Sequence, residues 1–345
     1  MMSRFIYILG SLFLLCACVH EFPTPQDAPV TVKLTFDTDM PIYKEEVFKT
    51  KAEEGTDLSD IYNIRYVLKA FPQRKSGTFY TTATQTWIFT EDDLKDQNYQ
   101  TQIELPEGVY KFMCWSDYYM EDEQSGLFYS VDDNFQIIRE NTDYIGNNHM
   151  KDCYRGSTVI NVIRFGSKVE PVSGTIPMTR AISKFSIEAT DLKDFYQKAA
   201  ATKTELTGIK YYPQDINIED YVVVFYYTGF KPNAYNLHTD RPCDSNTGYS
   251  FKSTIKLMED GDQNPDNDKA FLGFDFCFAN GTETTVNLAI GIEDKVGNEI
   301  SLVKGINVHI QRGKHTIMRG RFMSQESYGG VAINPDFDGE FNIII

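Results

Sequence analysis

The sequence predicts an all-β protein built as two tandem β-sandwich domains, with one short helix near the start of the second. Runs of β-branched and aromatic residues recur at spacings of about 8 to 12 residues, as in sandwiches. Aromatic side chains make up 14% of the 345 residues, with 24 Phe and 21 Tyr, and such side chains fit a pleated sheet surface. The third observation is a sharp turn within residues 103–115 that joins two apolar strands.

That turn, IELPEGVYKFMCW, combines two residues that favour chain reversal. Pro106 lacks a backbone donor, and Gly108 permits backbone conformations that other residues avoid. Beyond it, Tyr110 points to one face of the second strand and Trp115 to the other, since strand side chains alternate. The pattern predicts structure rather than chemistry.

The N-terminus predicts export and lipid attachment. Arg4 precedes an apolar run at residues 5–15 that is too short to span a bilayer as a helix. The run ends in Leu-Cys-Ala-Cys, which resembles the bacterial lipobox, and Cys16 takes the small-residue position. We therefore expect residues 1–17 to be a signal peptide, Cys18 to be the lipidation site, and residues 18–28 to be a Pro-containing tether. The alternative is an ordinary secretory signal with two incidental cysteines.

The charge and the cysteine spacing exclude some classes of function. The formal net charge is −16, so the surface repels nucleic acid, and membrane attachment must come from acyl chains. Cysteines 114, 153, 243 and 277 show no metal-ligand spacing, and their pairing cannot be predicted from sequence. Cys114 and Cys277 lie in strand-like runs and are expected to be small buried apolar groups.

The predicted N-terminal domain covers residues 29–180. Its strands are expected at residues 29–36, 61–71, 84–89 and 156–163 and on both sides of the turn within residues 103–115, with two more strand-like runs within 126–138. Within residues 174–187, the apolar side chains change parity, which predicts a bulge or a crossing from one sheet to another. The domain boundary is placed there.

The predicted C-terminal domain covers residues 181–345. Its helix is expected at residues 191–203, capped by Thr190, because apolar side chains recur there at helical spacing. Its strands are expected at residues 221–227, 251–258, 271–278, 285–293, 300–303, 306–311, 316–323 and in the tail 331–345. Two hairpin turns are predicted, at residues 296–298 and at residues 312–314.

Three motifs carry a resemblance to a known family. The turn LPEGVYKFMCW resembles a signature of the fimbrillin-like lipoproteins of Bacteroidales, which include anchor subunits and stalk pilins of type V fimbriae. MTRAISKFSI, with Arg180, is similar to that family's strand at the domain junction. INVHIQRGKHTIMRGRF is similar to its closing hairpin, where Thr316 and Gly320 match.

The resemblance implies two transthyretin-like Greek-key sandwiches, lipid anchoring at the outer membrane, and partners that are fimbrial subunits joined by strand complementation. It also implies that stalk pilins lose their first strand to a trypsin-like protease. Here the residues from Cys18 to the start of the second strand contain lysines but no arginine. This favours an uncleaved anchor or accessory subunit, although cleavage at Lys49 or Lys51 would also remove strand one.

No motif for an enzyme, a nucleotide or a zinc site is present, and we expect no enzyme activity, no metal and no cofactor. An acidic run at residues 260–268 spaces its oxygens as a calcium loop does, but Pro265 and Phe271 stand where such a loop needs glycine and an acid. The remaining alternative is a surface lipoprotein that binds a glycan or a host protein through exposed tyrosines.

Overall fold

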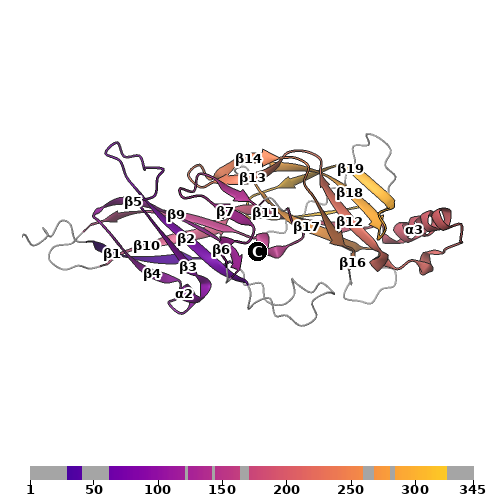
Figure 1. Ribbon diagram of the computed structural model, residues 1–345, viewed down its shortest axis with the longest axis horizontal. Coiled ribbons are helices and arrows are strands. Elements are labelled where there is room, and N and C mark those ends of the chain that lie inside the picture. The colour runs from indigo at the N-terminus through magenta and orange to yellow at the C-terminus, as the bar shows by residue number, and fades with distance from the viewer. Residues whose placement is uncertain are drawn as a thin grey trace, which may run out of the picture.

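The computed structural model describes residues 29–40, 62–120, 123–141, 144–163, 171–258, 268–279 and 284–324. Strands dominate this part of the chain and form four sheets (Figure 1). The prediction of an all-β fold is therefore confirmed. The transthyretin-like Greek-key arrangement remains a prediction.

The largest sheet has eight strands and contains most of the N-terminal half of the chain. Along the sheet the order is β3 (Gln85–Thr90), β2 (Tyr62–Pro72), β5 (Gly108–Met120), β9 (Tyr154–Val162), β10 (Val172–Arg180), β1 (Val30–Asp37) and β4 (Gln100–Leu105), with β6 (Glu123–Gly126) paired to β5.

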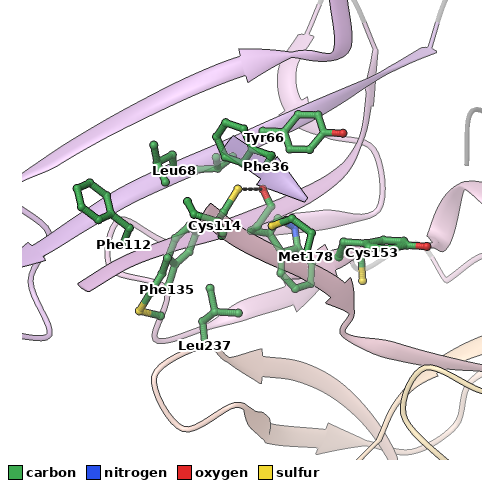
Figure 2. Close-up of a cluster of buried hydrophobic side chains, with 14 of the residues drawn as sticks. Phe36, Tyr66, Leu68, Phe112, Cys114, Phe135, Cys153, Met178 and Leu237 are labelled. Carbon is green, nitrogen blue, oxygen red and sulfur yellow. Dashed lines mark hydrogen bonds between the residues drawn. The ribbon is translucent and has the colours of Figure 1, made fainter. Parts of the chain in front are cut away.

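Strand β10 folds this sheet into two layers. Its residues 172–177 pair with β1, whereas its residues 178–180 pair with β9. The layers meet through side chains such as Phe36 of β1, whose ring lies 5.5 Å from that of Tyr66 and 6.1 Å from that of Phe89. Phe36, Tyr66, Phe112 and Cys114 all belong to the resulting core (Figure 2). A sandwich core thus forms from one continuous sheet.

The Pro106 turn connects the two layers and does not form a hairpin. β4 pairs with β1, while β5 pairs with β2 and β9, so the strands on either side of the turn have no common ladder. Gly108 has a φ of 159°, and a Cβ there would lie 3.2 Å from the ring of Tyr110. Close approach of this aromatic ring therefore adds to the backbone reason for glycine.

The change of side-chain parity marks the passage between sheets at Ala181. β10 ends in the first sheet, and β11 (Ile182–Ala189) begins a second sheet with the order β16 (Lys256–Leu257), β17 (Ala270–Phe278), β11 and β20 (His315–Gly320). A third sheet packs with it around a separate core, in the order β15 (Ser250–Thr254), β12 (Tyr221–Tyr227), β18 (Thr284–Asp294) and β19 (Glu299–Ile310).

Each half of the chain contains a parallel pair of strands. β1 pairs in parallel with β10, and β11 pairs in parallel with β20. The hairpin predicted at residues 312–314 is therefore wrong, because β20 pairs with β11 and the turn carries the chain from the third sheet to the second. The two strands predicted at residues 300–303 and 306–311 form the single strand β19, whereas the hairpin turn at residues 296–298 joins β18 to β19 as predicted.

The described residues include two α-helices rather than the single one predicted. α2 (Glu91–Lys95) has a capping box between Thr90 and Asp93. α3 (Leu192–Thr207) is longer than predicted, and its N-cap is Asp191 rather than Thr190. A carboxylate oxygen of Asp268 accepts a hydrogen bond from the backbone nitrogen of Lys193 at 2.5 Å. Three 3-10 helices, η3 (His149–Lys151), η4 (Pro213–Asp215) and η5 (Ile218–Asp220), are the other helical elements of the part of the chain that the structure describes.

The fourth sheet takes strands from both halves of the chain. Its order is β14 (Arg241–Asn246), β13 (Lys231–Asn236), β8 (Ile138–Glu140) and β7 (Tyr129–Val131). Tyr235 and Leu237, from the second half, belong to the first core. Side chains of the two predicted domains therefore intermix here, and the boundary at residue 180 remains a prediction.

Replacement of Leu34 by alanine tests the burial of β1. Leu34 is 0% exposed, and we expect Leu34→Ala to lower the free energy of unfolding by about 2–5 kcal/mol in urea denaturation. Lys33→Ala, at the next position and on the opposite face of β1, is the matched control and should change it by less than about 0.5 kcal/mol. Equal effects of the two changes would contradict the observed register.

Candidate functional site

Several predicted site residues lie outside the described part of the chain. These are the lipidation residue Cys18, the processing candidates Lys49 and Lys51, the tail at residues 331–345, and all of the acidic run except Asp268. The predictions made for them remain predictions.

Trp115 of the turn motif lies where the two halves of the chain meet. It is 0% exposed, and its ring lies 5.5 Å from that of Tyr129, in an edge-to-face arrangement. Its ring also lies 6.5 Å from the rings of Tyr235 and Phe278, which belong to the second half. Such aromatic pairs add to the stability that area burial provides. The motif therefore helps to form the junction.

The other motif residues make contacts near the ends of strands. Arg180, the last residue of β10, donates from Nε to both carboxylate oxygens of buried Asp152, at 3.0 and 3.2 Å. Thr316 donates to the carbonyl of His309 at 2.8 Å. A Cβ at Gly320 would lie 3.1 Å from the ring of Phe322, which is buried.

A cluster of four buried charges lies at the junction of the two cores. Lys151 Nζ lies 2.8 Å from Asp275 Oδ1 and 3.2 Å from Glu140 Oε1. Lys231 Nζ lies 2.5 Å from the other oxygen of Glu140. The exposed fraction of these residues is 8% or less. Two cations and two anions balance, as burial of charge requires.

Aromatic hydroxyls complete this junction charge cluster. Tyr144 and Tyr227 both donate to Asp275 Oδ2, the latter at 2.7 Å. Burial, together with the negative charge of Asp275, raises the pKa of both tyrosines. Burial alone would lower the pKa of Lys151, but the charges of Asp275 and Glu140 raise it overall. Lys151 is thus held as an ammonium group and the two tyrosines as neutral phenols.

A second polar contact joins the halves near the surface. The carboxylate of Asp240 lies 2.5 Å from Arg155 Nε and 3.0 Å from Arg312 Nη1. Tyr235 donates to the same carboxylate at 2.7 Å. Arg155 is in the first sheet and Asp240 follows β13, so this contact adds to the connection made by the fourth sheet.

Strand β1 forms a second candidate site, for a partner rather than a small molecule. It lies between β10 and β4 and is paired to both through backbone hydrogen bonds. Val30, Val32, Leu34 and Phe36 alternate into the core with at most 2% of their surface exposed. A groove that holds such a strand would accept another strand with the same alternation.

An open cleft of about 510 Å³ lies on the outer face of β2 and β3, next to β7. Polar and charged residues form most of its wall, including Arg65, Lys69, Thr86, Asp133 and Asn141. Its volume is in the range that accepts a small ligand, and exposed tyrosines do not gather in it.

Two histidines lie near Lys184 at the outer face of the second sheet. His149 belongs to η3 and His315 to β20. The ring of His149 lies 4.3 Å from that of Phe274, and His315 Nε2 lies 2.9 Å from Ser186 Oγ. Burial, followed by the charge of Lys184, lowers the pKa of His149 to about 3 and that of His315 to about 4. The folded protein therefore holds both imidazoles neutral.

Sequence reasoning missed the junction charge cluster. Its members are separated by up to 135 residues, from Glu140 to Asp275, and follow no motif spacing. One signal was present, since Asp275 is the single charged residue in the strand AFLGFDFCF. A charge inside such a buried strand requires a partner. Cys114 and Cys277 are buried as predicted, and the four described cysteines are not paired with one another.

Comparison with protein families identifies a match over residues 23–345 to the family described as "Family of unknown function (DUF6562)". The chain belongs to this family. No curated protein has significant sequence similarity to the chain.

Solved structures with a similar fold come from Bacteroidales. They include the fimbrial anchor protein Mfa2 of Porphyromonas gingivalis, with 12% identity, coverage of 80% of this chain and 82% of that one, and a TM-score of 0.40. A fimbrial assembly protein of Parabacteroides distasonis has 10% identity, coverage of 87% and 93%, and a TM-score of 0.35. A Bacteroides thetaiotaomicron protein, proposed in its description to bind polysaccharides, has 15% identity, coverage of 81% and 80%, and a TM-score of 0.44. Proteins described as a fimbrial anchor and a fimbrial assembly protein are therefore among the structures to which this chain is similar.

Two further results concern only the residues described above. No helix among them is long and apolar enough to cross a membrane. No group of three or more His, Cys, Asp or Glu side chains in these segments is arranged to hold a metal ion.

The two shifted histidines predict a pH dependence of stability. Their folded-state pKa values lie below the ordinary value of 6.5, so the unfolded chain binds more protons. Their contribution is complete above pH 6.5 and is lost as the pH falls through about 4 and then about 3. We expect the free energy of unfolding, measured in urea between pH 7 and pH 4, to fall less steeply in a His149→Gln, His315→Gln double variant.

A matched control is His309→Gln on the exposed face of β19. It removes an imidazole without touching the second sheet's outer face. If the double variant kept the slope of the unchanged protein, the two histidines would not be held neutral in the fold.

Proposed function

We propose that this protein is an outer-membrane lipoprotein that acts as a fimbrial anchor or accessory subunit in cell adhesion, and is not an enzyme. It would consist of two transthyretin-like Greek-key sandwiches and join other fimbrial subunits by strand exchange.

The observation that carries the proposal is the lipobox-like Leu-Cys-Ala-Cys that ends the apolar N-terminal run. Lipid on Cys18 would hold the chain at the membrane through its acyl chains, with residues 18–28 as the tether. The three fimbrillin-like motifs then follow in order. Trp115 packs against Tyr235 of the second half, and Arg180 bonds to Asp152 at the end of β10. Motif residues at such contacts constrain the fold, which supports a shared architecture.

Strand exchange is supported by the position of β1. Its ladders to β10 and β4 are made by backbone groups, so their affinity does not depend on side-chain identity. The alternating buried residues supply the specificity. In an anchor subunit β1 stays in place, and the exchanged strand is added at another edge.

A stalk pilin is the second candidate. Lys49 and Lys51 follow β1 and precede β2 in the sequence, so cleavage there would separate β1 from the rest of the chain. The groove between β10 and β4 would then be free for a strand of a neighbouring subunit.

Membrane fractionation of cells that carry Cys18→Ala tests the proposed anchor. We expect the variant to move from the outer-membrane fraction to the soluble fraction and to lose metabolic labelling with a fatty acid. Fimbriae should be released into the medium. Cys16→Ala is the matched control, because alanine fits the small-residue position of the lipobox, and it should stay in the membrane. Continued labelling and membrane retention of Cys18→Ala would exclude this anchor.

A further inference from the structure

The junction charge cluster contains the groups that an amide bond between two side chains of one chain requires for its formation. It combines an amine nucleophile, a carboxyl group, two hydroxyl donors on that carboxyl group, and a second carboxylate. We propose that Lys151 and Asp275 become joined by an intramolecular isopeptide bond between Nζ and Cγ, with Glu140 as the proton carrier. This goes beyond the proposed function and does not rest on it.

The nucleophile is in place. Lys151 Nζ donates to Asp275 Oδ1 at 2.8 Å. Because Oδ1 is bonded to Cγ, the nitrogen lies within about 4 Å of the carbon that it attacks, close to a near-attack distance. Lys151 is 2% exposed and Asp275 is 0% exposed. The two groups are therefore held together and shielded from bulk water.

Two phenols are positioned to stabilise the charge that develops on the carboxyl group. Tyr144 and Tyr227 both donate to Asp275 Oδ2, on the side away from the attacking nitrogen. When Nζ adds to Cγ, one oxygen becomes an oxyanion, and preformed donors at that oxygen lower the barrier.

Glu140 is the group that accepts and returns the proton. Its Oε1 lies 3.2 Å from Lys151 Nζ, within reach for proton transfer. Its other oxygen lies 2.5 Å from Lys231 Nζ, which orients the carboxylate and keeps a compensating charge beside it. Lys231 donates to Glu140. The carboxyl group with two phenol donors is that of Asp275, which contacts Lys151, so the geometry favours Lys151 as the nucleophile.

The steps balance without an external reagent. Lys151 passes one proton along its hydrogen bond to Asp275, which leaves a neutral amine beside a neutral acid as the reactive form. The amine forms the C–N bond, Glu140 takes a second proton from nitrogen and gives it to the departing hydroxyl, and water leaves. Of the three ammonium protons, one remains on the amide and two leave in the water.

The bond would join two elements far apart in the chain. Lys151 ends η3, next to the first core, and Asp275 lies in β17, between the two cores. It would be a covalent connection between the halves at the point where the fourth sheet already links them. A chain pulled between its two ends would then resist separation of the cores.

Peptide mapping by mass spectrometry tests the bond. The purified protein is digested with trypsin under denaturing conditions and the peptides are sequenced. We expect a peptide that contains Lys151, uncut at this residue, joined to a peptide that contains Asp275, lighter than their sum by one water molecule. Lys151→Arg should abolish the joined peptide. Glu140→Gln, of nearly equal size, should lower its amount by at least about tenfold.

The matched control is Asp117→Asn in the buried pair of Arg65 with Asp117, whose atoms lie 2.6 Å apart. That pair has similar burial but contains no amine nucleophile and takes no part in the proposed reaction. The joined peptide of Lys151 and Asp275 should therefore persist in the Asp117→Asn variant. A map of the unchanged protein in which Lys151 is cut and Asp275 retains its carboxyl group would overturn the proposal. A water loss that maps to other residues would overturn it as well.

Discussion

The fold depends on how four charges are buried where its two cores meet. Removing a charge from water is costly, and only close opposite charges with further hydrogen bonds offset that cost. Lys151, Lys231, Glu140 and Asp275 meet this condition together, but no one of them would meet it alone. Since they come from both halves of the chain, the cost is offset only when the halves are correctly placed. The cluster therefore specifies the junction more than it stabilises it.

The first core is closed at the junction by residues outside β1. Trp115, Tyr129 and Phe278 form an aromatic layer there. The parallel pairing of β1 with β10 repeats in β11 with β20. β1 contributes burial and hydrogen bonds, and its ladder to β4 connects that edge strand to the rest of the sheet.

Local patterns in the sequence predicted strands where one face is buried. The alternation of β1 and the apolar run of β12 are such cases. The pairing of strands was less predictable, because the residues that turn a hairpin also turn a crossing between layers. The Pro106 turn and the turn at Gly313 are both crossings. β13 and β14 were missed, since Pro232 and Pro242 and their polar neighbours are typical of loops. The charge cluster depends on tertiary contacts alone.

The most direct test of the role proposed here is the mass of the mature protein extracted from its own cells. An anchor subunit should start at Cys18, carry lipid and keep β1. A chain that starts after Lys49 or Lys51, without lipid, would contradict the anchor role. That result would instead identify a pilin whose first strand is removed so that a neighbour's strand can take its place.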